Sequence, residues 1–327
     1  MIKSNLSELT KLIEKKKKVL IVSHYSPDGD ALGSSFALYN FLKSINIDSY
    51  VYNQDSVPEY LSFLSINNDF TNTIDLLPKD LDLVIILDLN DLERAGKEMM
   101  AYIKDEFIQK DKDLIVIDHH ENNKIHYGNS FIDTNACSTG VILYRLIKQF
   151  NAEILPEIAT CLMTTIITDT SSYKNSNSNT ESFSSSAELV GLGADLNLIN
   201  ENIFKLGEIK KLKLRNMIYS TLLVNEEAKL ALCVAEHSFY KETKTSKEDS
   251  EGIANSLIFY NGIEIGAFIR EIDKDEWKIS LRTNNFIDLS LFANSFGGGG
   301  HKNASGFIYK GKINNLIDEI LMKLRNE

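Results

Sequence analysis

The sequence predicts an α/β protein of two domains, and three observations lead to this fold class. Apolar runs at 18–24, 81–91 and 113–122 have no regular polar alternation, which is typical of strands covered on both faces of a parallel sheet. Segments with apolar residues at helical spacing, such as 30–45, separate these runs. The length of 327 residues favours two domains, because single hydrophobic cores stop growing at about 250–300 residues.

The N-terminal half is predicted to alternate strands and helices and then to become helical. A shorter strand is expected at 48–54, after the helix at 30–45. From Ser138 the apolar spacing becomes helical, and Ser138 or Thr139 is expected to cap the first helix of this part. The expected helical segments here are residues 138–150, 156–170 and 180–205.

The C-terminal part is predicted to form a second, smaller α/β domain. Its expected strands are residues 229–238, 262–273 and 276–284, and its expected helices are residues 249–259, 288–296 and 314–327. A charged, amphipathic segment at 201–222 is a candidate for a connecting helix. The predicted bounds are residues 1–190 for the first domain, 191–224 for a helical linker and 225–327 for the second domain.

The composition disfavours several classes of protein. The formal net charge of −11 argues against long duplex DNA as the main ligand. No apolar run approaches the roughly 20 residues needed to cross a bilayer, and the N-terminus lacks the pattern of a secretory signal. The three cysteines, Cys137, Cys161 and Cys233, form no CxxC pair, so neither a disulfide framework nor a zinc knuckle is expected. We therefore expect a cytoplasmic protein without membrane contact.

Acidic and histidine side chains follow three of the predicted strands and one apolar helix. In an open parallel sheet, ligands bind at the carboxyl ends of the strands, so these side chains are expected to converge at one edge. The residues concerned are His24, Asp28, Asp30, Asp88, Asp118, His119, His120 and Asp169.

Each of these aspartates alone has an ordinary explanation; Asp30, for example, could simply cap the helix that begins near Ala31. Together, at least four carboxylates in one cleft would repel each other strongly unless divalent cations neutralise them. Histidine and carboxylate ligands without cysteine suit Mn²⁺ or another borderline cation better than structural zinc. Two such ions about 3.5–4 Å apart are a usual apparatus for phosphoester hydrolysis.

Five ordered motifs resemble the DHH phosphoesterase superfamily. They are HYSPDGDALGS at 24–34, LDLNDLERAG at 87–96, DHHENN at 118–123, TDT at 168–170 and FGGGGHKNASG at 296–306. The chain resembles in particular the bacterial subgroup with a C-terminal DHHA1 domain, which contains the nanoRNase/pAp phosphatase (NrnA-like) enzymes. This resemblance covers nearly the full length and implies an N-terminal DHH domain with a mainly parallel sheet flanked by helices, a linker helix and a DHHA1 domain.

The resemblance implies a site with two Mn²⁺ ions, with Mg²⁺ or Co²⁺ as alternatives. One ion would be bound by His24, Asp28 and Asp88, and the other by Asp30, Asp88, His119 and Asp169, with Asp88 bridging. Asp118 would orient its neighbours, and His120 would face the scissile phosphate. A water molecule between the ions would attack phosphorus in line.

The second domain is implied to hold the substrate. Its glycine run matches neither GxGxxG nor the Walker A pattern, and a flexible tether is the alternative interpretation. The resemblance implies that the amides of Gly298, Gly299 and Gly300, together with His301, hold a far phosphate or base. Arg282 would grip a phosphate, for which the guanidinium fork is suited. Closure of the two domains would set the distance between the metals and Arg282.

Two features remain open at this level. Arg94 in the LERAG stretch matches the family pattern without an assigned role, and a structural salt bridge is the favoured interpretation. Ser171 and Ser172 follow Asp169 where relatives commonly have glycine and an aromatic residue soon after. This departure puts the local loop conformation in question, although not the Asp169 ligand.

The leading hypothesis for function is a Mn²⁺-dependent phosphohydrolase that degrades short RNA oligonucleotides and dephosphorylates 3′-phosphoadenosine 5′-phosphate (pAp). The alternative within the enzymes is hydrolysis of a cyclic dinucleotide or of its linear product pGpG. Digestion of long single-stranded DNA is disfavoured by the lack of a basic surface, and inorganic pyrophosphatase by the glycine-rich domain. A nucleotide-binding module without activity is disfavoured because every candidate position keeps a ligand-competent residue. The resemblance also implies a homodimer.

Overall fold

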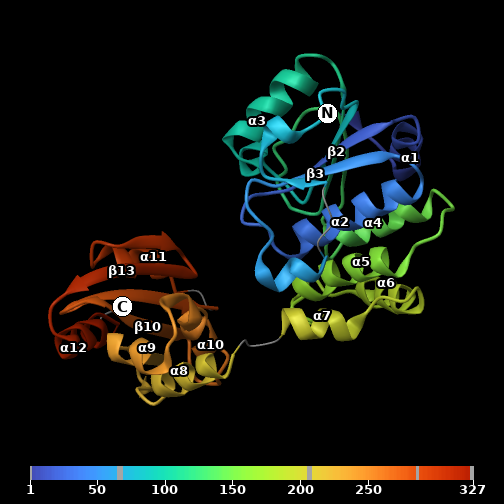
Figure 1. Ribbon diagram of the computed structural model, residues 1–327. Coiled ribbons are helices and arrows are strands. Elements are labelled where there is room, and N and C mark those ends of the chain that lie inside the picture. Colours follow the sequence, from blue (N-terminus) through green and yellow to red (C-terminus); the bar gives the residue numbers. More distant parts are fainter. Residues whose placement is uncertain (1, 65–68, 205–207, 285–286, 325–327) are drawn as a thin grey trace. The chain divides into compact units, whose positions relative to one another are not determined.

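The chain forms two compact units in the computed structural model, which describes residues 2–64, 69–204, 208–284 and 287–324 (Figure 1). Contacts divide the chain into Met1–Lys205 and Leu206–Glu327. The first unit contains a parallel sheet and the second a mixed sheet, which confirms the predicted α/β class with two domains. The bounds predicted for the linker and the two domains stay a prediction.

The first unit is built on a sheet in which all pairs of neighbouring described strands are parallel. The strand order is β1-β7-β6-β5-β2-β3-β4, so β6, β5 and β2 lie side by side at the centre. The strands are β1 (Ile2–Lys3), β2 (Lys18–Val22), β3 (Asp48–Tyr52), β4 (Phe70–Thr71), β5 (Leu83–Leu87), β6 (Asp113–Asp118) and β7 (Asn129–Ile132).

Helices cover both faces of this sheet, and this explains the apolar runs without alternation. In β2, Val19 and Ile21 belong to one core and Leu20 and Val22 to the other. Helices α2, α4 and α5 pack on the first of these faces and α3 on the second (Figure 1). The α-helices of this unit are α1 (Leu6–Ile13), α2 (Gly29–Ser44), α3 (Lys97–Ile103), α4 (Thr139–Lys148), α5 (Pro156–Asp169), α6 (Thr180–Gly191) and α7 (Leu196–Ile203). Shorter turns of helix are η1 (Glu59–Leu64), η2 (Ile74–Leu76), η3 (Leu92–Ala95) and η4 (Lys104–Ile108).

Two details of these helices follow from capping chemistry. Ser138 is the N-cap of α4, where its hydroxyl accepts a hydrogen bond from the Val141 amide, as predicted. The expected single helix at 180–205 is wrong, because α6 ends at Gly191 and α7 begins at Leu196. Gly193 has φ +93°, a left-handed conformation that favours glycine and that commonly ends a helix.

The second unit has a mixed sheet in the order β12-β13-β11-β10-β9-β8. Among its described strands, β9 and β10 pair in parallel and the other neighbours are antiparallel. The strands are β8 (Leu223–Asn225), β9 (Leu230–Ala235), β10 (Ile265–Asp273), β11 (Glu276–Thr283), β12 (Gly299–His301) and β13 (Ala304–Lys310).

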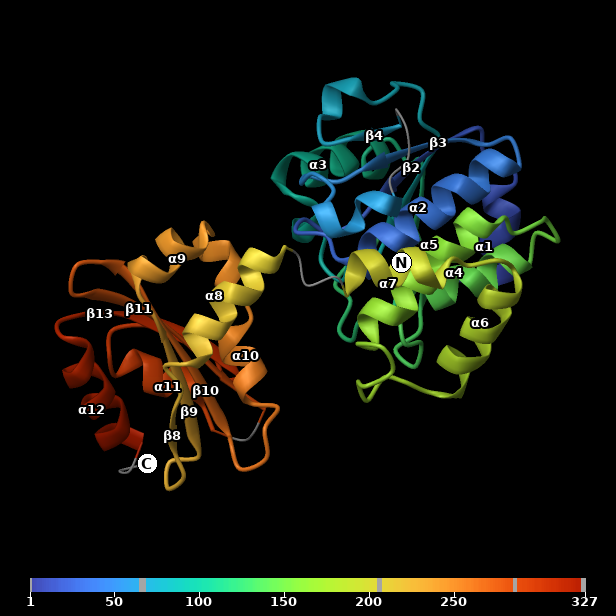
Figure 2. The same ribbon diagram turned by 60° about the horizontal axis from the view of Figure 1, so that its bottom comes forward.

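Helices also cover both faces of the second sheet (Figure 2). Helices α8 and α10 pack on one face, and α11 and α12 pack on the other. The helices are α8 (Ile209–Tyr219), α9 (His237–Thr243), η5 (Lys247–Ser250), α10 (Ile253–Leu257), α11 (Leu289–Asn294) and α12 (Ile313–Leu324). The connecting helix expected at 201–222 corresponds in the described residues to the end of α7 in the first unit and to α8 in the second.

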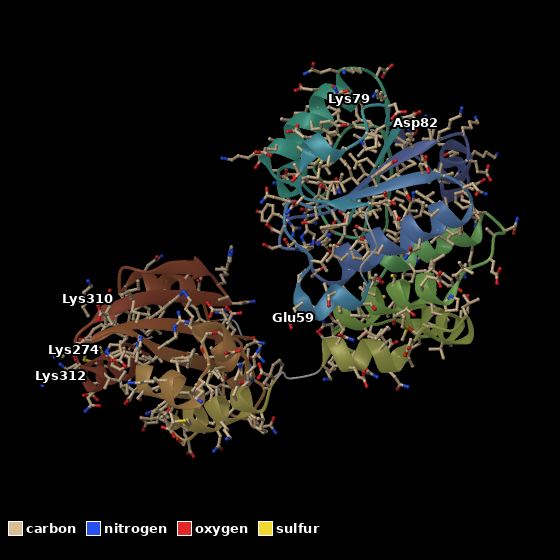
Figure 3. All side chains as sticks on the ribbon, in the orientation of Figure 1. Glu59, Lys79, Asp82, Lys274, Lys310 and Lys312 are labelled. Carbon is tan, nitrogen blue, oxygen red and sulfur yellow. The ribbon has the colours of Figure 1, made fainter. Side chains whose placement is uncertain are left out.

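Charged side chains lie on the outside of both units, for example Lys79 and Asp82 on the first and Lys274 and Lys310 on the second (Figure 3). Within the described ranges, no helix combines the length and the apolar character needed to cross a bilayer.

Candidate metal centre and active site

The central strands of the parallel sheet deliver most of the predicted site residues to one edge. His24 follows the end of β2, Asp88 follows β5, and Asp118 is the last residue of β6. His119 and His120 come directly after Asp118. Because β6, β5 and β2 are parallel neighbours, their carboxyl ends meet at the same edge. The sequence prediction placed these side chains together for this reason.

Two helices supply the remaining acidic residues of the cluster. Asp28 is the N-cap of α2, where its carboxylate accepts hydrogen bonds from the amides of Asp30 and Ala31. The interpretation in which Asp30 caps this helix is therefore wrong, because Asp30 lies inside the first turn and faces the interior. Asp169 is the last residue of α5.

The cluster consists of two histidine–carboxylate groups that share Asp88. His24 Nε2 lies 3.4 Å from Asp88 Oδ2 and 3.8 Å from Asp28 Oδ2. On the other side, His119 Nε2 lies 3.6 Å from Asp88 Oδ1, from Asp30 Oδ2 and from Asp169 Oδ2. Asp88 thus presents one carboxylate oxygen to each group. The structure brings together all eight predicted cluster residues once His120 and Asp118 are included.

These separations fit ligands of a cation better than hydrogen-bonded pairs. Hydrogen bonds between nitrogen and oxygen are typically about 2.7–3.2 Å long, whereas two ligands bound at about 2.1 Å to one ion are about 3.0–3.5 Å apart. The ring Nδ1 atoms of His24 and His119 lie 2.8 Å and 3.3 Å from the carbonyl oxygens of Tyr25 and Ala136. A carbonyl oxygen only accepts, so Nδ1 donates, and in the neutral imidazole each Nε2 directs a lone pair toward the carboxylates. The acidic and histidine groups are therefore placed for metal binding.

The N-terminus of α4 holds the buried carboxylate of Asp30, whose side chain is 1% exposed. The amide of Thr139 donates to Asp30 Oδ2 at 2.7 Å, and the amide of Gly140 donates to Oδ1 at 3.1 Å. These are amides of the first helical turn, which have no partner within the helix and which favour a negative charge. The sequence predicted Thr139 as a helix cap only, so this second role of α4 was missed.

Thr139 also orients Asp88. Its hydroxyl donates to Asp88 Oδ1 at 3.1 Å, on the oxygen that faces His119. Asp88 itself has φ +54°, a left-handed conformation that aspartate tolerates better than most residues. Burial raises the pKa of the Asp88 carboxyl, but His24, His120 and His119 outweigh burial, and the pKa is held below its usual value. Asp88 is therefore ionised, as a bridging ligand needs to be.

Two carboxylates of the cluster, those of Asp30 and Asp169, have raised pKa values. Burial raises the pKa of Asp30 well above its usual range, and the charges of Asp88 and Asp169 add to this. Burial also raises the pKa of Asp169 to about 6; His119 opposes the shift and Asp88 reinforces it. Carboxylates that repel one another in this way gain most from a bound cation.

Asp169→Asn is expected to change how the stability of the metal-free chain depends on pH. The pKa of the Asp169 carboxyl is near its ordinary value of 3.8 in the unfolded chain and about 6 in the folded chain. Between these values the folded state binds more protons, so the free energy of unfolding of the wild type falls as the pH rises. The variant lacks this contribution. Urea unfolding in a chelator should therefore show the variant gaining stability relative to the wild type from about pH 4 to about pH 6.

The exposed Asp75 provides the matched control, since Asp75→Asn should show no such trend. A stability difference between Asp169→Asn and the wild type that stays constant over this pH interval would contradict the raised pKa.

His120 forms its hydrogen bond with Asp118, and its Nδ1 lies farther, at 3.5 Å, from Oδ1 of the shared carboxylate of Asp88. Asp118 is fully buried, and its Oδ1 accepts from His120 Nδ1 at 2.8 Å and from the amides of His119 and His120. Asn123 donates to Asp118 Oδ2. The hydrogen bond from His120 to Asp118 raises the pKa of the imidazole. Because Nδ1 donates this hydrogen bond, Nε2 is the ring nitrogen that remains available to a ligand or substrate.

The salt bridge favoured for Arg94 is absent from the described residues, among which no carboxylate lies within 4.0 Å of its guanidinium. Arg94 is half-buried in η3, six residues after Asp88, and its backbone carbonyl accepts from the Tyr25 amide next to His24. Its charge acts on His120, where it lowers the pKa of the imidazole against the effect of Asp118. Arg94 is therefore a half-buried cation beside the cluster.

The loop after Asp169 has a conformation that the sequence left open. Ser171, Ser172 and Tyr173 have φ values of +48°, +58° and +64°, three left-handed residues in succession. Glycine would adopt this conformation with less strain, which is a physical reason for the family pattern at this point. The loop returns Asn177 to the cluster, where its amide donates to the carbonyl of Cys137 at 2.9 Å and to Asp169 Oδ2 at 3.3 Å. The strained turn thus restrains Asp169.

The glycine-rich stretch of the second unit forms an edge hairpin, β12 with β13. A side chain at Gly298 would collide with the Gly306 carbonyl oxygen, and one at Gly300 with the Ala304 carbonyl oxygen. Close approach of two strands therefore explains these glycines, and the flexible tether is wrong. Gly299 and His301 are exposed on β12.

Arg282 and His301 lie in one row of the second sheet. Ala304 of β13 pairs with Arg282 of β11 on one side and with His301 of β12 on the other. Residues directly opposite each other in paired strands point to the same face, so both side chains belong to the face that carries α10. Substrate binding by these residues stays a prediction.

Comparisons with known proteins agree with this arrangement. The model of the DHH family N-terminal domain matches residues 18–166, and that of the DHHA1 domain matches residues 227–326. The chain belongs to the DHH and DHHA1 families. The predicted resemblance is confirmed, and all eight residues of the cluster except Asp169 lie within the matched DHH segment.

Similar proteins align with this DHH/DHHA1 chain over nearly its whole length. The bifunctional oligoribonuclease and PAP phosphatase NrnA of Thermus thermophilus is 26% identical, over 98% of this chain and 93% of its own. The protein of the same name from Bacillus subtilis is 23% identical, over 92% of both chains. A crystal structure of an exopolyphosphatase-related protein from Bacteroides fragilis has 28% identity and a TM-score of 0.80, over 98% of this chain and 95% of that one.

Proposed function

We propose that this DHH/DHHA1 chain is a Mn²⁺-dependent phosphohydrolase that degrades short RNA oligonucleotides and removes a phosphate from pAp. Its family and relatives make it a hydrolase of the phosphodiesterase or phosphatase class. The observation that carries the proposal is the shared carboxylate of Asp88, with one oxygen toward His24 and the other toward His119. Relatives named oligoribonuclease and PAP phosphatase support the choice of substrate.

The residues are proposed to hold two ions in the sets that the two groups define. His24, Asp28 and Asp88 would bind one ion, and Asp30, Asp88, His119 and Asp169 would bind the other. Mixed imidazole and carboxylate ligands suit Mn²⁺, with Mg²⁺ or Co²⁺ as alternatives. Bound divalent cations supply the positive charge that lowers the pKa of water and offsets the charge of the phosphate.

The chain's own groups then have separate tasks. The helix α4 and Thr139 hold Asp30 and Asp88 at fixed orientations before the substrate arrives. His120, held by Asp118 through Nδ1, is proposed to donate a proton from Nε2 to the leaving oxygen as the phosphorus–oxygen bond breaks. The half-buried guanidinium of Arg94 is proposed to bind a non-bridging oxygen of the same phosphate. Arg282, the amides of Gly298 to Gly300 and His301 are proposed to hold another part of the substrate.

An assay of the purified chain with different metals and substrates tests this proposal. We expect Mn²⁺ to support release of mononucleotide from a 5′-labelled RNA dinucleotide and of phosphate from pAp, with no turnover in a chelator. Mg²⁺ and Co²⁺ should support less turnover than Mn²⁺. A chain that releases neither product with any of these metals would refute the proposal, whereas turnover of pGpG alone would favour the alternative phosphodiesterase. Sedimentation in the same buffer tests the homodimer, which stays a prediction.

A further inference from the structure

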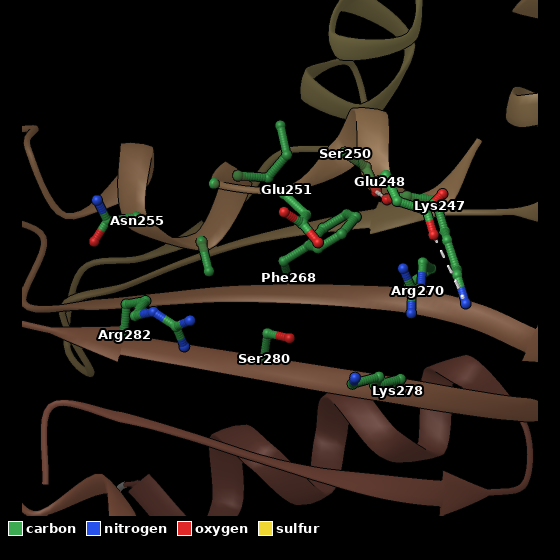
Figure 4. A pocket seen from close by; sticks show the side chains of 13 residues that line it. Lys247, Glu248, Ser250, Glu251, Asn255, Phe268, Arg270, Lys278, Ser280 and Arg282 are labelled. Atoms are coloured by element: carbon green, nitrogen blue, oxygen red, sulfur yellow. Dashed lines mark hydrogen bonds and ion pairs between the residues drawn. The ribbon is translucent and has the colours of Figure 1, made fainter. Parts of the chain in front are cut away.

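The second unit contains a cavity that is lined in part by cationic side chains. The cavity has a volume of about 600 Å³ and lies between the face of the sheet that carries α10 and the segment η5–α10. Its sheet side consists of Phe268 and Arg270 on β10 and of Lys278, Ser280 and Arg282 on β11 (Figure 4). The proposed substrate residue Arg282 lies at one end of this row, and Lys278 and Arg270 lie at the other.

Arg270 and Lys278 are directly opposite each other in neighbouring strands. Two like charges in this position repel and destabilise the sheet. Neither side chain forms an ion pair within 4.0 Å of a carboxylate in the part of the chain that the structure describes. The nearby Lys247 pairs with Glu248 at 3.8 Å, so it is not equivalent to these two cations. Arg270 is half-buried and Lys278 is exposed, and the charge of Arg270 acts on that of Glu248 on the opposite wall. Two facing cations without a close ion pair leave their hydrogen-bond donors available for an anionic ligand.

The opposite wall of the cavity has a different character. It carries the carboxylates of Glu248 and Glu251 and the amide of Asn255 (Figure 4). Carboxylates repel a second phosphate but accept hydrogen bonds from hydroxyl and amino groups. The cavity therefore suits a ligand with one anionic group for the sheet side and hydroxyl or amino donors for the wall, as in a nucleoside monophosphate.

We propose that Arg270 and Lys278 form a phosphate subsite for a nucleotide, separate from Arg282. Lys278 and Arg282 are four residues apart on one strand, which corresponds to about 13 Å at the usual rise of about 3.3 Å per residue. The two ends of the row therefore bind different groups of a substrate or different substrates. This inference deepens the proposed function, since it identifies where the second unit holds a phosphate away from the bond that is cleaved.

Binding of AMP and of adenosine to the full-length chain in a chelator tests the subsite. Without metal, the carboxylates of the DHH cluster repel a phosphate, so the experiment reports on other sites. We expect AMP to bind the wild type at least about tenfold more tightly than adenosine, as charge-assisted hydrogen bonds to phosphate provide. The double variant Arg270→Gln/Lys278→Gln should reduce this preference to about twofold or less, with adenosine affinity unchanged.

Thermal unfolding separates loss of the subsite from damage to the fold. Removal of the facing charges should leave the melting temperature of the double variant equal to or above that of the wild type. Lys274→Gln on the turn between the same two strands is the matched control and should keep the preference for AMP (Figure 3). Absence of AMP binding to the wild type, an unchanged preference in the double variant, or an equal loss of adenosine binding would each overturn the subsite.

The binding experiment and the assay of hydrolysis can fail separately. A chain without hydrolytic activity that binds AMP through Arg270 and Lys278 retains the subsite and loses the proposed function. A chain that hydrolyses RNA dinucleotides with Mn²⁺ and whose double variant binds AMP as the wild type does retains the function and loses the subsite.

Discussion

Asp88→Asn is expected to reduce kcat of the Mn²⁺-loaded chain by at least about 10³-fold, the largest effect of any single substitution. Asp88 is 2% exposed and offers one oxygen to each histidine–carboxylate group, so its loss removes a ligand from both proposed ions. Asparagine tolerates the left-handed backbone at this position, where φ is +54°, and it retains an acceptor for the Thr139 hydroxyl. The fold should therefore survive the substitution.

Metal content and stability make this test independent of the activity. We expect at least two Mn²⁺ ions per wild-type chain and at most one per variant chain after equilibrium dialysis. The melting temperature of the metal-free variant should equal or exceed that of the wild type, because one charge of a repelling cluster has been removed. Asp75→Asn, at an exposed position outside the cluster, is the control for an aspartate substitution. Turnover by the variant close to that of the wild type would show that Asp88 does not bridge.

His120→Asn is expected to lower kcat for an RNA dinucleotide by about 10²–10⁴-fold, the usual range for loss of a general acid. His120 donates through Nδ1 to the buried Asp118, and its Nε2 is the nitrogen available for proton transfer. Asparagine places an amide where Nδ1 was, so Asp118 keeps a donor and is not left unpaired. The variant should therefore lose the proton donor and keep the supporting hydrogen bonds.

A comparison of two substrates with different leaving groups shows whether His120 acts as a general acid, as a metal ligand or as a structural residue. A p-nitrophenyl ester of a nucleotide needs little protonation of its leaving oxygen, so for this substrate we expect a loss of only about tenfold or less. Metal content should equal that of the wild type. His126→Asn, an exposed histidine outside the cluster, serves as control. An equal loss of kcat for both substrates would exclude proton donation to the leaving group.

Local sequence determined much of the first unit. The apolar runs at β2, β5 and β6 predicted a parallel sheet, because strands that are buried on both faces contain few polar residues. Once the strands are parallel, their carboxyl ends meet, and the residues that follow them are neighbours whatever the details of the loops. His24, Asp88 and His119 were predicted to lie together on this ground. The long helix expected at 180–205 failed because a single glycine, Gly193, ends α6 in a left-handed conformation.

Only the tertiary structure determined how the cluster is held and which cations of the second unit face each other. The amides of Thr139 and Gly140 reach Asp30 across more than a hundred residues, and such contacts have no periodic signature in the sequence. The register of β10 with β11 sets Arg270 against Lys278, although each is an ordinary surface cation when considered alone. Residue types and local spacing therefore determined the helices and strands and the chemistry at the carboxyl edge of the parallel sheet. The partners of each charge depend on strand register and helix packing, which arise only when distant segments share a core.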